Sequence, residues 1–265
     1  MLPCRLTFLA CFSDGAPRKV IGKNGELIYQ RAKAVNHQAD AGTMRENGGK
    51  PRLSMQGAGA ILVDAAGPLF DDACQGRIWA MASFLRGIAG VSETVPGMNN
   101  LMVVFDPLAL DPAALEREIL SLWDHTLPNT GAGRTIEVPV VYGGESGEDL
   151  SALAHSKGMS VEELVALHSA PLYSVAAVGA MPGFVYLSGL NPRLATPRRA
   201  VPRMNVPVGS VIIGGAQAGI MPLTAPSGWH IIGSTGIALF DPHREPPAAF
   251  RPGDRIRFVP EEIRQ

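Results

Sequence analysis

Cysteine is scarce in this sequence, and its few cysteines are scattered. The 265 residues contain three, Cys4, Cys11 and Cys74, and none belongs to a Cys-x-x-Cys pair. An odd, dispersed set of thiols argues against a disulfide framework and against a cysteine-based zinc site. We therefore expect reduced thiols and predict no metal in this chain.

An excess of charge of one sign is also missing. Lys and Arg together number 23 and Asp and Glu 24, which gives a formal net charge of -1. This balance provides no field that would recruit nucleic acid or an anionic membrane surface. Apolar residues make up 46% and charged residues 18%, which is typical of a folded globular protein. We expect neither nucleic acid nor membrane as a partner.

Long apolar runs are absent as well. The runs at 101–105 and 237–240 are far shorter than the roughly 20 residues that span a bilayer. Residues 6–12, LTFLACF, follow Arg5 and faintly resemble a secretory signal. The run is too short for one, and no convincing small-residue cleavage site follows it. The sequence therefore predicts a cytoplasmic protein.

Residues 1–50 differ in composition from the rest of the chain. They hold Lys19, Lys23, Lys33 and Lys50, and a single lysine, Lys157, follows them. No period of 3.6 or of 2 persists there over a useful length. Two explanations stay open: a disordered extension, or a start codon assigned too far upstream. We predict no function for this segment.

Residues 51–126 alternate between strand and helix patterns. Strands are predicted at 59–66, 91–95 and 101–107, and apolar residues recur at helical spacing between 73 and 90. Asp111 and Pro112 supply the N-cap and the first-turn proline of a second helix that ends near 125. The order of elements predicts a small α+β domain.

Residues 127–136 are rich in Gly, Pro and Asn and are predicted to form a linker. Two short helices are expected after the next strand, and the second begins with the capping box Ser160 and Glu163. From residue 172 onward, short β-rich pieces are separated by Gly and Pro at close spacing. This texture predicts a β-barrel domain over 137–262, so the chain as a whole is mostly β with an α+β part.

No motif for nucleophilic, metal or phosphate-loop chemistry is present. The sequence lacks GxSxG, HExxH, GxxxxGK[ST] and a GxGxxG that follows a strand. No catalytic residue can therefore be assigned. The polar residues that could carry chemistry are concentrated between Tyr186 and His230.

Four arginines occupy a loop that prolines stiffen: Arg193, Arg198, Arg199 and Arg203. Guanidinium groups bind carboxylate or phosphate with two parallel hydrogen bonds, and a stiff backbone lowers the cost of holding them in place. The alternative is that these are ordinary solvated charges, because arginine is the usual cation of this chain. Composition alone favours this second explanation.

Three further features have both a functional and a structural explanation. Gln217 lies among glycines that permit close backbone approach, which also suits a tight hairpin. His230 follows Trp229 and could be an acid, a base or a packed side chain. Asp149, with the acidic residues just before it, could form an acidic lip or simply favour a helix N-terminus.

The stretch from Met181 to Pro242 resembles a known family. It contains PGFxYL, PRLATPRR, VPxGSV, a GxQxG element, PLxxPxGW and LFDP in order. These motifs are similar to those of the KipI / allophanate hydrolase subunit 1 family. The resemblance covers about residues 53–260, and the family's better-characterised role is the B component of the bacterial ATP-dependent 5-oxoprolinase complex.

The resemblance implies a fold and a set of partners. The barrel would be cyclophilin-like, as in the carboxyltransferase region (subdomains C and D) of urea carboxylases. The complex would hydrolyse 5-oxoproline to glutamate with ATP as a co-substrate, and this chain would be inactive alone. Its partners would be a homologous C component (KipA-like, allophanate hydrolase subunit 2) and an A component (LamB/YcsF-like).

The resemblance also suggests which residues form a site at the mouth of the barrel. Substrate or anion binding would fall to Arg193, Arg198, Arg199, Gln217 and His230. The pocket would be shaped by Pro182, Gly183, Phe184, Tyr186, Met221 and Trp229.

Several positions depart from the family pattern: Ala180, Asn191, Met221 and His230. A phenol is common at the position of Met221, so this chain lacks a hydrogen-bonding group there. The departures leave open an amidohydrolase subunit of the allophanate hydrolase type that acts on another substrate. They also leave open a KipI-like protein that inhibits a sensor histidine kinase. A peptidyl-prolyl isomerase would follow from fold analogy alone.

Overall fold

The computed structural model describes residues 18–21, 27–30, 49–128 and 133–264. The chain divides into two units, residues 1–49 and 50–265. In the first unit, β1 (Arg18–Ile21) and β2 (Leu27–Gln30) form an antiparallel pair. The other residues of the predicted extension, and the question of where the chain starts, lie outside the described residues.

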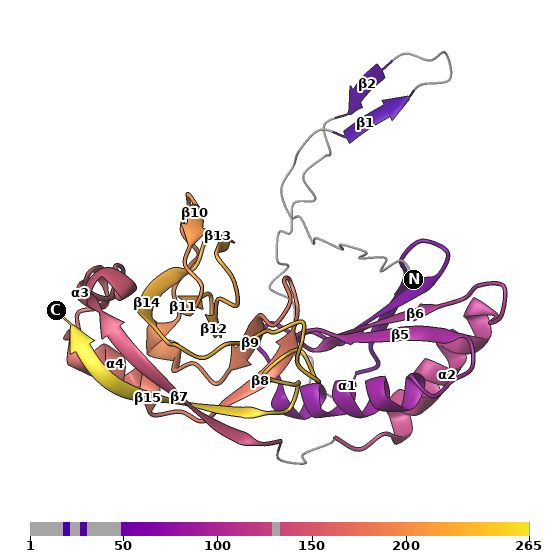
Figure 1. Cartoon of the computed structure of the whole chain (residues 1–265). Coiled ribbons are helices and arrows are strands. Elements are labelled where there is room, and N and C mark those ends of the chain that lie inside the picture. Colours follow the sequence, from indigo (N-terminus) through magenta and orange to yellow (C-terminus); the bar gives the residue numbers. More distant parts are fainter. Residues whose placement is uncertain (1–17, 22–26, 31–48, 129–132, 265) are drawn as a thin grey trace. The chain divides into compact units, whose positions relative to one another are not determined.

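The first part of the second unit is a four-stranded antiparallel sheet with two helices (Figure 1). Its strand order is β3-β4-β6-β5. Its elements are β3 (Arg52–Met55), β4 (Ala60–Asp64), α1 (Asp72–Leu85), β5 (Val91–Pro96), β6 (Asn100–Phe105) and α2 (Pro112–His125). The α+β arrangement predicted for 51–126 agrees with these elements, and the sequence argument did not assign β3.

Alternation along two strands explains why both helices pack on the sheet. In β4 and β6, buried and half-buried residues alternate, so Ile61 and Leu101 point to one face. Ile78 of α1 and Ile119 of α2 are fully buried in the same cluster. Asp71 caps α1 by accepting a hydrogen bond from the Cys74 N–H, and Asp111 caps α2 in the predicted way.

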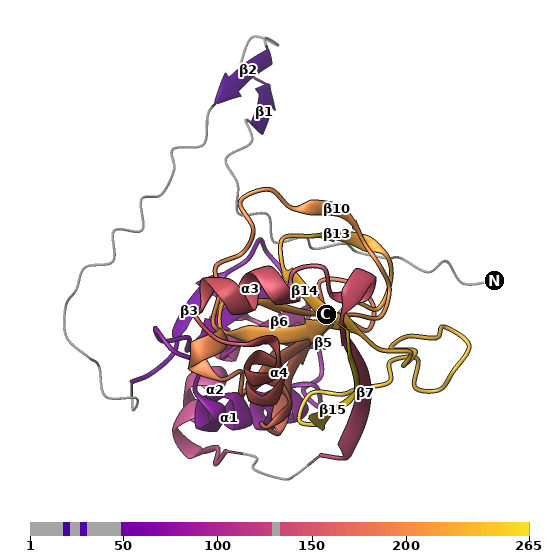
Figure 2. The ribbon, with the colours of Figure 1, turned by 90° about the vertical axis from the view of Figure 1, so that its left-hand side faces the viewer.

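A closed seven-stranded barrel follows (Figures 1 and 2). The strand order around it is β11-β12-β9-β8-β15-β7-β14, and β15 runs parallel to β7. The strands are β7 (Thr135–Gly143), β8 (Tyr173–Val178), β9 (Val185–Ser188), β11 (Ser210–Gly214), β12 (Gln217–Ile220), β14 (His230–Ser234) and β15 (Arg255–Arg264). The prediction of a mostly β protein with a barrel is confirmed.

Short helices and one extra strand pair complete the unit. These elements are η1 (Gly144–Gly147), α3 (Leu150–Ser156), α4 (Val161–Ser169), η2 (Pro192–Leu194), β10 (Arg203–Val206) and β13 (Ala225–Ser227). The predicted capping residue Ser160 accepts a hydrogen bond from the Glu163 N–H at 3.1 Å. Strands β10 and β13 pair with each other outside the barrel. The predicted hairpin at Gln217 is present, because Gly214 pairs with Gln217.

One predicted strand is wrong. Residues 237–242, IALFDP, form no strand, and Phe240 makes a single bridge to Ala248. Leu239 is nevertheless buried in the barrel core. An apolar run therefore indicated burial correctly. The prolines that follow, Pro242, Pro246 and Pro247, cannot donate hydrogen bonds to a ladder.

The sheet and the barrel share polar contacts at one buried point. Gln75 of α1 is fully buried, and its Nε2 donates to the carbonyl of Ala176 in β8 at 3.0 Å. Trp79 Nε1 donates to the same carbonyl at 3.0 Å. The Gln75 side chain also accepts a bond from the Asn99 N–H at 2.7 Å. These bonds offset the cost of burying the groups and align α1 with β8.

The barrel core contains a buried histidine. Nδ1 of His168 lies 2.7 Å from the Tyr142 hydroxyl, its ring lies 4.6 Å from that of Phe258, and its Nε2 has no partner among the described residues. Burial lowers the pKa of His168 to about 3, because the charged imidazolium would lose its hydration. The ring is therefore neutral in the folded protein near pH 7.

His168 should make the stability of the protein fall as the pH falls. Below about pH 6.5 the unfolded chain protonates this residue and the folded chain does not, so the unfolded state gains protons and is favoured. Between pH 8 and pH 5 the free energy of unfolding should drop by about 2 kcal/mol from this residue. Urea unfolding at both pH values measures the change.

Two variants identify the source of this pH dependence. His168→Leu should remove most of it, although the variant is less stable at every pH because Tyr142 loses its partner. His155→Gln, at an exposed position of α3, should keep it. An equal pH dependence in all three proteins would show that His168 is not the cause.

Candidate functional site

The two faces of the barrel wall carry different clusters. Val185 and Leu187 of β9 belong to the main core, whereas Tyr186, between them, packs with a second cluster. Ile212 in β11 and Ile231 in β14 also join this second cluster, while their neighbours face the main core. Because side chains alternate along a strand, the second cluster lies on the outer wall of the barrel.

A cavity of about 200 Å³ opens in this outer wall. Three aromatic rings line it, those of Phe184, Tyr186 and Trp229, and they meet edge to face with centroids 4.8 to 6.2 Å apart. Met221 closes one side. The remaining lining residues are Ala180, Met181, Arg198, Pro226, Ser227 and Gly228. The sequence argument placed the site at the mouth of the barrel, and the cavity that its residues form is instead on the wall.

Backbone conformation at two neighbouring positions shapes the entrance. Ala180, which departs from the family pattern, lines the cavity with a φ of 65°, in the left-handed region that costs a residue with a Cβ atom about 1–2 kcal/mol. Gly183 has a φ of 81°, and a Cβ there would lie 2.8 Å from the Phe240 Cβ and 3.0 Å from the Leu239 carbonyl oxygen. Gly183 therefore brings the loop against residues 239–240.

Gly183→Ala should destabilise the protein by about 3 kcal/mol, since it adds overpacking against backbone to an unfavourable φ. Gly215→Ala is the matched control: its φ of 61° is equally unfavourable, but no atom lies within 4 Å of its Cβ position. The control should cost about 1 kcal/mol. Chemical denaturation gives both values. Equal losses would mean that the contact with residues 239–240 is unimportant.

The arginines predicted to bind anions have different surroundings. Arg198 lines the cavity, and its guanidinium carbon lies 5.8 Å from the centre of the Trp229 ring. Arg193 lies on η2, where its Nη2 is 2.7 Å from Glu163 Oε1 in an exposed ion pair. Arg199 binds Asp149. Arg198 is thus the one predicted arginine that faces this cavity.

The other predicted contacts lie outside the cavity lining. Gln217 begins β12 next to the hairpin turn, and His230 Nε2 lies 2.9 Å from the Pro197 carbonyl oxygen. The His230 contact ties the arginine loop to β14. Pro182 is exposed, and Gly183 is buried behind the wall. The structure thus brings Phe184, Tyr186, Met221, Trp229 and Arg198 together around one cavity.

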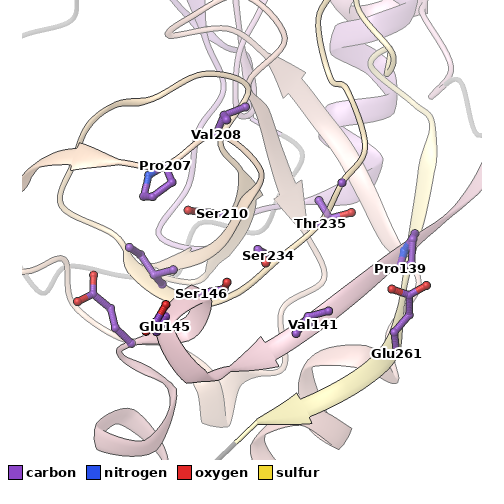
Figure 3. A pocket seen from close by; sticks show the side chains of 13 residues that line it. Pro139, Val141, Glu145, Ser146, Pro207, Val208, Ser210, Ser234, Thr235 and Glu261 are labelled. Carbon is purple, nitrogen blue, oxygen red and sulfur yellow. The ribbon is translucent and has the colours of Figure 1, made fainter.

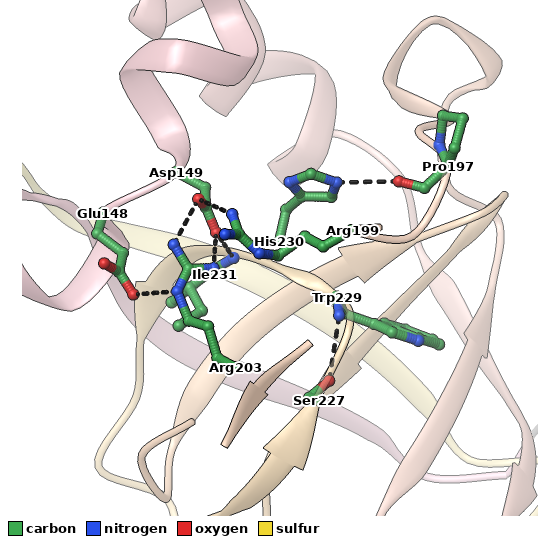
Figure 4. A network of polar contacts seen from close by, with 9 residues as sticks. All are labelled: Glu148, Asp149, Pro197, Arg199, Arg203, Ser227, Trp229, His230 and Ile231. Atoms are coloured by element: carbon green, nitrogen blue, oxygen red, sulfur yellow. Dashed lines mark hydrogen bonds and ion pairs between the residues drawn. The ribbon is translucent and has the colours of Figure 1, made fainter. Parts of the chain in front are cut away.

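Asp149 is the centre of a buried ion-pair network (Figure 4). Its residue is 8% exposed. Its two carboxylate oxygens accept bonds from Arg203 Nη1 and Nη2 at 2.7 and 2.8 Å, from Arg199 Nη1 at 3.1 Å, and from the Ile231 N–H at 2.8 Å. Arg203 Nε also contacts Glu148 at 2.8 Å. The network therefore joins α3, the arginine loop, β10 and β14.

Electrostatics keep Asp149 ionised. Burial alone would raise its pKa, but the Arg203 hydrogen bonds, the Ile231 N–H and the charges of Arg203 and Arg199 outweigh burial and hold the pKa below its usual value. Neither the acidic-lip nor the helix-terminus explanation identified this role. No sequence spacing indicates it, because Arg203 and Ile231 lie 54 and 82 residues away.

A second, larger cavity of about 560 Å³ lies beside this network (Figure 3). Its rim carries the carboxylates Glu145, Glu148 and Glu261. Its polar wall is made by four hydroxyl residues: Ser146, Ser210, Ser234 and Thr235. No group of His, Cys, Asp and Glu among the described residues has an arrangement that could hold a metal ion.

Membrane-spanning helices were also sought. Within the described ranges, no helix is long and apolar enough to cross a bilayer.

A barrel with an aromatic cavity in its wall, preceded by a small α+β sheet, defines the class of protein. The model of the carboxyltransferase domain, subdomain C and D, matches residues 51–250. The chain belongs to this family, and the family assignment made from the sequence is confirmed.

Relatives in the family share a name. The chain is 44% identical over 216 residues to the 5-oxoprolinase B component of Escherichia coli O157:H7, which covers 80% of this chain and 97% of the relative. It is 33% identical over 209 residues to the 5-oxoprolinase B component of Bacillus subtilis (strain 168), which covers 73% and 86%.

Solved structures have the same fold. The crystal structure of TTHA0988 matches with a TM-score of 0.67 and 37% identity, over 77% of this chain and 40% of that one. The urea carboxylase of Kluyveromyces lactis matches with a TM-score of 0.66 and 17% identity, over 78% of this chain and 21% of that one. At this low identity the second match shows the fold alone.

Proposed function

We propose that this chain is the B component of a 5-oxoprolinase complex, in which it works with a KipA-like component and a LamB/YcsF-like component. The observation that carries the proposal is the 44% identity to the Escherichia coli O157:H7 relative over 97% of that protein's length. The proposed complex uses ATP as a co-substrate and lies in the cytoplasm. No residue of this chain is assigned to ATP.

The outer-wall cavity suits a small cyclic carboxylate. Its volume of about 200 Å³ lies below the usual range of about 300–1,000 Å³ for drug-sized ligands, so a nucleotide would not fit. The rings of Tyr186 and Trp229 offer apolar faces to a five-membered lactam. Arg198 provides the cation for its carboxylate. We therefore assign 5-oxoproline binding to this cavity.

The chemical step is assigned to the two partner proteins. Opening the lactam requires water to add to the carbonyl carbon and the ring C–N bond to break, with the nitrogen leaving as an amine. The described residues that line the cavity include no carboxylate, imidazole or thiol that could act as a base. The Ser227 hydroxyl accepts a bond from the Trp229 N–H at 3.2 Å. This chain should therefore be inactive on its own.

Reconstitution tests the proposal. The chain is co-expressed with the KipA-like component of its own organism, the LamB/YcsF-like component is added, and ATP hydrolysis and glutamate release are measured with and without 5-oxoproline. We expect a stable complex whose ATP hydrolysis rises with 5-oxoproline. A stable complex that does not respond to 5-oxoproline would contradict the substrate, and a failure to assemble would contradict the role within a complex.

A further inference from the structure

We infer that the strand pair outside the barrel, together with the acidic cavity at its base, is the surface on which the KipA-like component docks. The strand pair, β10 with β13 and their flanking residues 201–208 and 223–227, is called the arm. The partner surface that it fits is an apolar groove bordered by a Lys or Arg side chain. This inference rests on the proposed role as one member of a complex.

The arm exposes large apolar side chains to solvent. Val201 is 75%, Met204 69% and Val208 58% exposed. Figures 1 and 2 both show β10 and β13 outside the barrel wall. Apolar residues gathered on one projecting element are typical of a protein interface, whereas single exposed apolar residues need no explanation.

The inner side of the arm is firmly held. Arg203 of β10 binds Asp149 through two hydrogen bonds, and Val206 is fully buried in the outer-wall cluster. Met204, between them, is on the solvent side. Because the anchoring residues fix the arm to the barrel, its apolar face is held ready for binding, and little conformational entropy is lost when a partner covers it.

The acidic cavity continues this surface. Pro207 and Val208, at the end of β10, line it together with Glu145, Glu148 and Glu261. Glu148 is paired with Arg203, and Arg264 is close enough to Glu145 to interact with its charge. Glu261 has no ion-pair partner among the described residues. The cavity therefore favours a cation.

A buried hydroxyl in the cavity wall points to a hydrogen-bonding ligand. Ser210 is 3% exposed, and its side chain has no hydrogen-bond partner among the described residues (Figure 3). A buried polar group without a partner costs about 1–3 kcal/mol, so a ligand that bonds to it gains this energy. An ammonium or guanidinium group supplies donors for Ser210 and charge for Glu261.

A protein, not a free amine, fits the whole surface. A small cation would neutralise the carboxylates but would leave Val201 and Met204 in water. Lys and Arg side chains combine an apolar stem with a cationic end, which matches the step from Val208 to the acidic cavity. The complementary charges of the two surfaces also speak against a second copy of this chain, which would present its own acidic cavity.

The affinity of the chain for the KipA-like component tests the inference. Met204→Asp should raise the Kd about 30-fold, because a charge would enter an apolar contact. Glu145→Lys combined with Glu261→Lys should raise it by a similar factor and weaken its dependence on salt. Leu108→Asp is the matched control at a 97% exposed apolar residue outside the arm, and should leave the Kd unchanged.

The outcomes separate the inference from the proposed function. If the wild-type chain binds the KipA-like component and supports turnover while both arm variants bind equally well, the docking surface is wrong and the proposed function stands. If the wild-type chain does not bind that component, both are wrong. If Met204→Asp instead abolishes a homodimer, measured by light scattering, the occupant is a second copy and the inference is overturned. Circular dichroism confirms that each variant is folded.

Discussion

Asp149→Asn is expected to lower the free energy of unfolding by about 3 kcal/mol. The amide has no charge to offset those of Arg199 and Arg203, and it replaces one acceptor oxygen by a donor that faces guanidinium groups. Breaking a buried ion pair by removing one partner is costly because the remaining charge stays buried without compensation. Urea denaturation of the isolated chain near pH 7 measures the loss.

The pH dependence of this loss identifies its origin. The folded-state pKa of Asp149 is below the usual value, so its contribution is fully present above the unfolded pKa of about 3.9. It is lost as the pH falls through the lower, folded-state pKa. The difference between wild type and Asp149→Asn should therefore be constant from pH 8 to pH 5 and shrink below about pH 4.

Glu163→Gln is the matched control for Asp149→Asn. It also changes a carboxylate to an amide in an ion pair with an arginine, but the Glu163–Arg193 pair is exposed. Such pairs contribute about 0–1 kcal/mol, so the control should lose little stability. Equal losses in the two variants would mean that the network around Asp149 is not a structural centre.

Arg198→Met is expected to raise the KM of the reconstituted complex for 5-oxoproline by about 30-fold. The replacement keeps an apolar side chain of similar length over Trp229 and removes the cation. A charged hydrogen bond to a ligand contributes about 1.5–3 kcal/mol, which corresponds to roughly a 10–100-fold change in affinity. Because the carboxylate does not react, kcat should change little.

Arg193→Met provides the comparison for Arg198→Met. Arg193 comes from the same proline-rich loop and is paired with Glu163 outside the cavity. This variant should keep the KM of the wild-type complex. If Arg193→Met raised the KM and Arg198→Met did not, the assignment of the substrate to the outer-wall cavity would be wrong.

Local patterns predicted most of the elements. Alternation along 101–105, the Asp111-Pro112 start of α2 and the Ser160 cap of α4 each correspond to an element of the structure. Such features depend on residues within a few positions of one another. Residues 237–242 were wrongly predicted as a strand, because burial of Leu239 occurs in a loop whose backbone bonds are local.

The candidate site was predictable in part. The motif around Phe184, Tyr186 and Trp229 identified the residues that surround the cavity. It could not separate Arg198 from Arg193, because both lie in one loop and differ in which distant side chain they approach. The larger cavity and its buried Ser210 had no signal in the sequence at all, since their neighbours come from separate strands.

The sequence by itself determined the family, the order of helices and strands, and the aromatic residues of the outer-wall cavity, because these depend on motifs and short-range periodicity. Only the tertiary structure decided that the cavity lies on the barrel wall, that Asp149 holds Arg203 and the Ile231 N–H, and that the arm projects from the barrel. The physical reason is that barrel closure brings together residues up to 82 positions apart, and their contacts depend on strand register, which no local pattern encodes.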